Sequence, residues 1–124
     1  MKYLGIDFGL KRVGLATSEG NLASPLKTIE VKGFKDIVEK VVKLVKTEGF
    51  DKIVVGLPEG KMGQTVLGFI KALRNFGIEA VEADETLSSQ KATAQMIELN
   101  VPKKDRRIND ATAAAIILQN YLDL

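Results

Sequence analysis

The chain has 124 residues, a length typical of a single domain, and 45% of them are hydrophobic, which is enough to form a core. Eighteen lysines and arginines against 16 acidic residues give a formal net charge of +2, so only the placement of the charges can indicate a nucleic-acid partner. Because cysteine and histidine are both absent, disulfides, thiolate metal sites and histidine-based catalysis are excluded, and any hydrolytic chemistry would depend on carboxylates, lysine, hydroxyl side chains or bound metal.

The first third of the chain predicts three antiparallel strands. Residues 3–8 and 13–17 are apolar runs joined by the basic turn 10–12, a pattern typical of a β-hairpin. Residues 22–31 follow as a third strand, and Pro25 indicates that this strand lies at an edge, where a missing N–H does no harm. The three strands therefore predict a meander in which the first strand is innermost.

The rest of the chain alternates between helical and strand patterns. The predicted elements are a helix from Phe34 to Gly49, a strand over 52–58, a helix over about 64–76, a strand over 78–83, a helix from Ser88 or Ser89 to about Leu99, and a helix that Asn109 caps and that ends near Leu122. Because a strand–helix–strand connection is right-handed, the strand at 52–58 should run parallel to the first strand. We therefore predict a single α/β domain over residues 1–124, with a mixed five-stranded sheet in the order 3-2-1-4-5 and helices on both faces.

Asp7 lies within the otherwise apolar first strand, where an unpaired carboxylate would be costly to bury. Glycine in a strand often marks a place where a ligand or another backbone comes close, and three glycines surround this residue: Gly5, Gly9 and Gly14. The combination indicates a site for a metal, a phosphate or both. The structural alternative is an Asp that caps the turn.

Further acidic residues are expected near the same edge of the sheet, because ligands gather outside the carboxyl ends of parallel strands. Asp84 and Glu85 follow the fifth strand, and Asp110 begins the last helix. Clustered carboxylates repel one another and need cations, and Mg²⁺ prefers oxygen ligands. Glu85 would have to reach back over about 10 Å, because the fifth strand lies two strands from the first. As alternatives, Asp110 could simply stabilise the helix dipole, and Asp84 and Glu85 could form a polar loop.

Basic residues occupy the loops expected to surround this edge. They are Lys11, Arg12, Lys61, Lys103, Lys104, Arg106 and Arg107. Such side chains contact phosphates and favour a nucleic-acid partner, although runs of charge are commonly solvated loops. Stacking platforms for single strands are not evident, because we expect four phenylalanines in the core: Phe34, Phe50, Phe69 and Phe76.

Four motifs, in this order and spread over essentially the whole chain, resemble the YqgF (RuvX) family. They are Gly5-Ile-Asp-Phe-Gly-x-Lys-Arg-Val-Gly-Leu-Ala16, Val55-Gly-Leu-Pro58, Asp84-Glu-x-Leu-Ser-Ser89 and the alanine-rich run 110–122. Members of that family are RNase H-like, resemble Holliday junction resolvases and are regarded as pre-16S rRNA processing nucleases. The resemblance implies catalysis by Asp7, Glu85 and Asp110, which would also bind Mg²⁺ or Mn²⁺. It further implies metal-dependent phosphodiester hydrolysis that matures the 5′ end of 16S rRNA.

The sequence departs from the family pattern in two places. Thr86 follows the Asp-Glu pair, where the family usually has Arg, so a contact expected there would have to come from Arg106, Arg107 or Lys61. The segment after Pro58 is also shorter than in many members.

Three hypotheses follow from these observations. The first is a metal-dependent nuclease acting on pre-rRNA, or on branched DNA as a Holliday junction resolvase-like enzyme. The second is a non-catalytic RNA-binding factor that acts on ribosome-assembly intermediates. The third is an actin-like ATPase, which opens with a similar glycine-rich hairpin but needs two such domains.

The sequence also gives expectations about location and assembly. No apolar run reaches the roughly 18 residues that a membrane-spanning helix needs, and no secretion signal is evident at the N-terminus. We therefore expect a cytoplasmic protein that has no membrane partner and exists as a monomer or weak homodimer.

Overall fold

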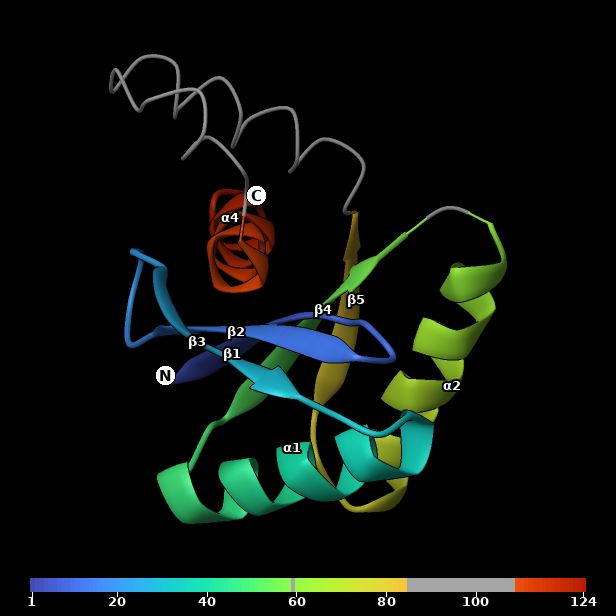
Figure 1. Cartoon of the computed structure of the whole chain (residues 1–124). Helices are drawn as coiled ribbons and strands as arrows, with labels where there is room; N and C mark the ends of the chain where they lie inside the picture. The colour runs from blue at the N-terminus through green and yellow to red at the C-terminus, as the bar shows by residue number, and fades with distance from the viewer. Residues whose placement is uncertain (59, 85–108) are drawn as a thin grey trace.

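The computed structural model of the chain describes residues 1–58, 60–84 and 109–124. Within these ranges the elements are β1 (Tyr3–Asp7), β2 (Arg12–Ser18), β3 (Ser24–Glu30), α1 (Phe34–Glu48), β4 (Lys52–Leu57), α2 (Lys61–Asn75), β5 (Ala80–Asp84) and α4 (Asp110–Leu122). The strands form one sheet in the order β3-β2-β1-β4-β5 (Figure 1). The predicted α/β class and strand order are therefore confirmed, and the helix predicted at about 88–99 lies outside the described residues.

The sheet is mixed, as predicted. β1 pairs antiparallel with β2 and parallel with β4, and β5 continues the parallel half. β3 is an edge strand that pairs antiparallel with β2, and Pro25 lies within it. The carboxyl ends of β1, β4 and β5 therefore share one edge of the sheet, which we call the carboxyl edge.

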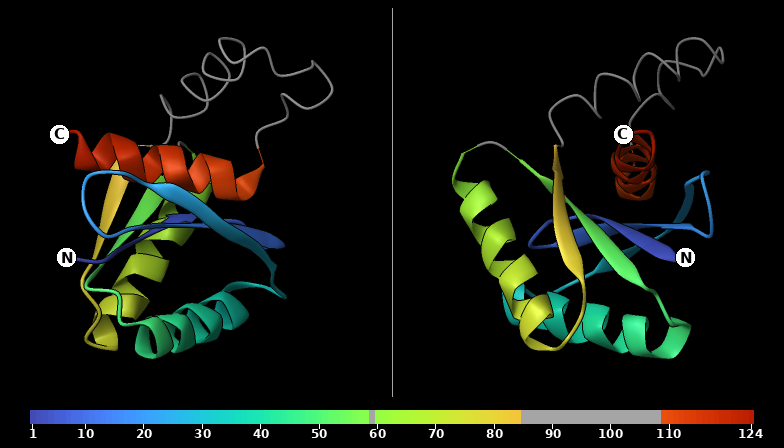
Figure 2. Two further views of the ribbon diagram at one scale, coloured as in Figure 1. Left: turned by 90° about the vertical axis from the view of Figure 1, so that its left-hand side faces the viewer. Right: turned by 180° about the vertical axis from the view of Figure 1, so that it is seen from behind.

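Helices cover both faces of the sheet, α1 and α2 on one side and α4 on the other (Figure 2). β1 contributes to both faces because its side chains alternate. Leu4 and Ile6 are fully buried in the larger core beneath α1 and α2, whereas Gly5 lies against α4. The core on the α4 side is smaller and consists of Ala16, Val54, Ala114, Ala115, Ile117 and Leu118.

Two of the glycines near Asp7 are explained by the close packing of α4. A Cβ atom at Gly5 would lie 2.8 Å from Cβ of Leu118 and 3.0 Å from the Ala114 carbonyl oxygen. A Cβ atom at Gly14 would collide with the Asp110 carbonyl. Glycines at these positions predict that a ligand or another backbone comes close, and at Gly5 and Gly14 it is the backbone of α4 that does so.

Helix ends follow the predicted signals. Gly49 ends α1 with a positive φ of 74°, and its N–H donates to the Val45 carbonyl at 2.8 Å. The Asn109 side chain caps α4 by accepting a hydrogen bond of 2.7 Å from the Thr112 N–H. Within the described ranges, every helix is too short or too polar to span a bilayer.

The start of α2 differs from the prediction. The helix begins at Lys61 rather than near residue 64, so Lys61 belongs to a helix and not to a loop. Gly60 precedes it with a positive φ of 81°, and Gly63 allows the first turn to sit close to the Pro58 carbonyl, 2.8 Å from where a Cβ would lie. Two glycines that favour a loop in the sequence instead let a helix start directly after β4.

The expectation that four phenylalanines are core residues is wrong for two of them. Phe50 and Phe69 are buried, but Phe34 is 38% exposed and Phe76 is 56% exposed. Phe34 is the first residue of α1, and Phe76 lies just beyond the last residue of α2. Terminal positions have helical neighbours on one side only, so a hydrophobic side chain there is incompletely covered.

Candidate functional site

Asp7 and Asp110 are brought together at the carboxyl edge. Asp7 ends β1 and is in register with Gly14 of β2, and the backbone of Asp110 packs on Gly14. Because Gly5 faces α4, the alternation of β1 places Asp7 on the same face. The absence of a side chain at Gly14 is what lets the first turn of α4 lie beside the end of β1.

Arg12 lies at the same place and pairs with Asp110. Its Nε is 3.6 Å from a carboxylate oxygen of Asp110. The Arg12 side chain is 69% exposed and the Asp110 side chain 31%, so the pair lies at the surface. Exposed ion pairs contribute about 0–1 kcal/mol, so Arg12 can exchange this carboxylate for another anion at little cost. Sequence analysis missed the pair, although Arg12 and Gly14 are two residues apart and therefore share a strand face.

Asp84 lies on the other face of the sheet. It ends β5 in register with Leu57, which packs against the core under α1 and α2. Its neighbour Ala83 packs against the α4 core, so alternation turns Asp84 away from that side. Glu85 lies outside the described residues. Among the residues that the structure does describe, no three potential metal-ligating side chains form a group.

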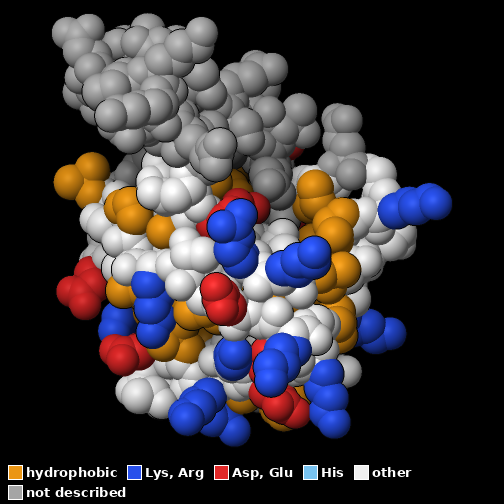
Figure 3. Space-filling view, viewed as in Figure 1, with side chains coloured by type: hydrophobic (Ala, Val, Ile, Leu, Met, Phe, Trp, Pro, Cys, Tyr) orange, Lys and Arg blue, Asp and Glu red, His pale blue; other side chains and the backbone are white. Residues whose placement is uncertain are grey.

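The basic residues of the hairpin and of α2 lie around this edge. Lys11 and Arg12 are exposed at the β1–β2 turn, and Lys61 is exposed at the start of α2. Figure 3 looks onto this side of the molecule, where basic side chains lie on both sides of a band of apolar ones. Four other basic residues predicted to bind nucleic acid lie outside the described residues: Lys103, Lys104, Arg106 and Arg107.

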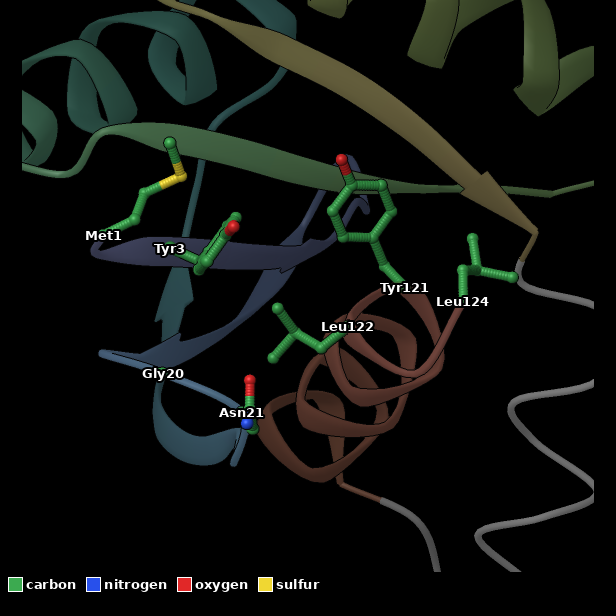
Figure 4. A pocket seen from close by; sticks show the side chains of 7 residues that line it. All are labelled: Met1, Tyr3, Gly20, Asn21, Tyr121, Leu122 and Leu124. Carbon is green, nitrogen blue, oxygen red and sulfur yellow. The ribbon is translucent and has the colours of Figure 1, made fainter.

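A separate hollow of about 470 Å³ lies at the opposite end of α4, near the start of β1 (Figure 4). It is lined by Met1, Tyr3, Gly20, Asn21, Tyr121, Leu122 and Leu124. The rings of Tyr3 and Tyr121 meet edge to face at 6.4 Å, and the Lys52 ammonium lies 5.5 Å from the centre of the Tyr121 ring. A hydrogen bond with Tyr121 raises the pKa of Lys52. Asp7 and Asp110 do not line this hollow.

Comparison with protein families gives one match that spans the chain. The family described as "RuvX: Holliday junction resolvase" matches residues 1–124. A "Putative pre-16S rRNA nuclease" of Bacillus cytotoxicus is 38% identical, with 99% of this chain and 98% of the relative covered. The protein of the same description from Syntrophus aciditrophicus is 36% identical and covers 99% of this chain and 89% of its own.

Solved structures show the same fold at lower identity. Thermus thermophilus RuvC in complex with a Holliday junction superposes with a TM-score of 0.64 at 18% identity, over 98% of this chain and 93% of the other. The fowlpox virus resolvase, in complex with Holliday junction DNA, gives a TM-score of 0.66 at 14% identity, over 99% and 97%. The architecture is therefore the RNase H-like resolvase fold.

Proposed function

The chain belongs to the RuvX family, and from this premise we propose that it hydrolyses phosphodiester bonds to mature the 5′ end of pre-16S rRNA, with Asp7, Glu85 and Asp110 as its metal-binding carboxylates. The observation that carries the proposal is the meeting of Asp7 and Asp110 over Gly14. A helix begins and a strand ends at one point, and each contributes an acid.

The chemistry of the two acids fits a hard divalent cation. Both offer carboxylate oxygens at a partly exposed edge, and the chain has no cysteine or histidine that would favour a softer metal. Bound Mg²⁺ or Mn²⁺ would activate the attacking water and offset the charge that develops on the phosphate. Two acids whose backbones lie close together would suit such an ion, since a cation offsets the repulsion between neighbouring carboxylates.

We assign the third carboxylate to Glu85 rather than to Asp84. Asp84 belongs to the sheet face covered by α2, whereas Asp7 and Asp110 belong to the α4 side. The assignment therefore rests on the orientation of Asp84 and on the family resemblance of the Asp84-Glu85 motif. It makes Asp84→Asn a matched control for Glu85→Gln.

The basic residues around the edge would hold the phosphate backbone of the substrate. Lys11, Arg12 and Lys61 surround the acids from two elements, and the run 103–107 adds further positive charge in the sequence. Such contacts position a strand without reading its sequence. A structured precursor RNA, presented within ribosome-assembly intermediates in the cytoplasm, matches this mode of binding. We expect the single domain to act as a monomer or weak homodimer.

Branched DNA is the second candidate substrate. The matching family is described as a Holliday junction resolvase, and two of the solved relatives were determined with junction DNA. A third possibility, a non-catalytic RNA-binding factor, draws support from Thr86, where the family usually has Arg.

One experiment separates these functions. A pre-16S 5′-leader RNA and a four-way DNA junction are incubated with the protein in Mg²⁺, Mn²⁺ or EDTA. We expect the RNA to be cut only with metal, and Asp7→Asn and Glu85→Gln to lose at least about a hundredfold in rate, whereas Asp84→Asn stays within a few fold of wild type. Cleavage of the junction alone would identify the DNA nuclease. RNA binding without any cleavage would favour the binding factor, and undiminished cleavage by Asp7→Asn would exclude the proposed site.

A further inference from the structure

Three phenylalanines form a cluster directly beneath the carboxyl edge. The Phe8 and Phe69 rings lie 5.1 Å apart, and the Phe34 ring lies 6.5 Å from Phe8 and 6.4 Å from Phe69. Phe34 meets Phe69 edge to face at 85°. Phe8 and Phe69 are buried, whereas Phe34 keeps 38% of its surface exposed. The two buried rings therefore fix the orientation of a third ring that remains open to solvent.

Phe34 lies near the same edge as the acidic pair but on the opposite face of the sheet, because Phe8 and Phe69 belong to the core beneath α1 and α2. Phe8 directly follows Asp7 in the chain, so the ring that touches Phe34 is attached to the residue after the acid. The Val31 N–H donates to the Lys11 carbonyl at 2.9 Å, which ties the segment leading into Phe34 to the basic turn. Figure 2 (left) shows the starts of α4 and α1 and the tip of the β1–β2 hairpin on one side of the molecule.

The charges around Phe34 suit a phosphate backbone. Lys11 and Arg12 lie in the adjoining turn, and Lys35 follows Phe34 and is exposed. Asp36, two residues after Phe34, is already engaged. It accepts a hydrogen bond of 2.8 Å from the Lys32 N–H and lies 3.2 Å from the Lys40 ammonium. These partners hold the pKa of Asp36 below its usual value, so it remains a neutralised anion and does not leave a free negative charge beside the ring.

We propose that the exposed surface of Phe34 stacks on an unpaired base of the substrate strand where the strand crosses the α1 side of the carboxyl edge, on the sheet face opposite Asp7 and Asp110. The inference rests on the proposed nuclease function and adds a preference for single-stranded character in the part of the strand that passes Phe34. Partly exposed aromatic rings flanked by cations are how many proteins bind single strands. A fully paired base has no free face to offer. Phe34 is thus a substrate-positioning residue rather than part of the hydrolytic chemistry.

The chain contains two tyrosines but no tryptophan, so Phe34→Trp creates a single, selectively excitable tryptophan at the proposed platform. Phe76→Trp is the matched control, because Phe76 is more exposed but lies beyond the far end of α2, toward the start of β5. Each protein is titrated in EDTA with a single-stranded RNA of the pre-16S 5′-leader sequence and with the same RNA paired to its complement. In the Phe34→Trp protein we expect strong quenching of the indole by the single strand and weak quenching by the duplex. In the Phe76→Trp protein neither RNA should quench the fluorescence.

Affinity gives a second readout that does not depend on cleavage. Phe34→Leu keeps an apolar side chain of similar reach but removes the flat ring, so we expect it to weaken single-strand binding on the order of tenfold, with Phe34→Tyr near wild type. Duplex binding should change little.

Three results would each overturn the inference: no quenching in Phe34→Trp, equal quenching in Phe76→Trp, or unchanged affinity of Phe34→Leu. The platform and the nuclease function can also fail separately. Quenching without cleavage would keep the platform and reject the nuclease, and cleavage without quenching would do the reverse.

Discussion

The Arg12 guanidinium contacts a carboxylate that the proposed function assigns to a metal ion. In the absence of a cation the positive charge of Arg12 offsets part of the repulsion between Asp110 and Asp7. If Asp110 bound a cation, the guanidinium would be free to turn toward solvent, where a substrate phosphate could replace the carboxylate. Under the proposed function, Arg12 would thus pair with Asp110 before the metal binds and with a substrate phosphate afterwards.

Replacing Arg12 should separate these two roles. Arg12→Ala removes the cation that competes with the metal, so we expect the affinity for Mn²⁺ in the absence of RNA to rise, by no more than about fivefold because exposed ion pairs are worth up to about 1 kcal/mol. RNA binding should weaken in the same variant. Mn²⁺ titration followed by electron paramagnetic resonance measures the first effect, and filter binding measures the second.

Lys11→Ala is the control for this prediction. Lys11 is the neighbour of Arg12 in the turn, but it is Arg12 that lies 3.6 Å from the Asp110 carboxylate. Lys11→Ala should weaken RNA binding without raising Mn²⁺ affinity. Equal Mn²⁺ affinity in wild type and Arg12→Ala would show that the guanidinium does not compete with the metal.

At the scale of elements, the site depends on how closely α4 packs on the β1–β2 hairpin. Gly5 and Gly14 leave two gaps in the sheet surface, and α4 occupies both with its backbone and with small residues such as Ala114. The gap at Gly14 determines where Asp110 lies relative to Asp7. The same packing thus contributes to stability and positions the acids.

A methyl group at Gly14 should lower the stability of the fold and also misplace the two acids. Gly14→Ala places a Cβ where the Asp110 carbonyl lies, and backbone cannot move aside as a flexible side chain can. We expect a loss of about 1–3 kcal/mol in the free energy of unfolding and a decrease in cleavage larger than the decrease in folded protein explains. Urea unfolding followed by circular dichroism gives the first quantity, and activity per folded molecule gives the second.

Gly68→Ala serves as the opposite control, because the added Cβ there meets nothing within 4 Å on the surface of α2. This change should raise the free energy of unfolding by up to about 1 kcal/mol and leave cleavage unaltered. If Gly14→Ala were as stable and as active as wild type, the argument from close packing would be wrong.

Periodicity and turn residues are sufficient to predict the strand order, the mixed sheet and the caps at Gly49 and Asn109. These features are local, or follow from the handedness of a single connection. The predicted start of α2 is three residues late because Gly63 suggests a loop, and its real role is a close approach to Pro58 that only the packed structure reveals.

The candidate site is only partly predictable from sequence, because it too depends on contacts that form only in the packed structure. Asp7 and Asp110 are far apart in the chain, and their proximity depends on the packing of α4 on Gly14. The pairing of Arg12 with Asp110 and the exposure of Phe34 likewise depend on tertiary packing. Sequence could only propose candidate acids, whereas the orientation of Asp84 away from Asp7 and Asp110 required the register of β5 with β4.

At the scale of the whole molecule, the net charge of +2 is too small to attract RNA strongly by itself. Basic side chains lie around the carboxyl edge, and others are spread over α1, where acidic residues accompany them (Figure 3). Binding that depends on phosphate contacts should therefore respond to individual lysines according to position rather than to total charge.

The salt dependence of RNA binding tests this directly. Removing one lysine that binds a phosphate should reduce the slope of log K against log salt concentration by about 0.7 for single-stranded RNA. Lys61→Ala, at the start of α2, should show this reduction, because Lys61 lies beside the carboxyl edge. Lys46→Ala removes the same charge from the last turn of α1, at the other end of that helix from Phe34, and should leave the slope unchanged. Equal salt-dependence slopes for Lys61→Ala and Lys46→Ala would mean that the protein attracts RNA through its overall charge. The carboxyl edge would then not be the binding surface.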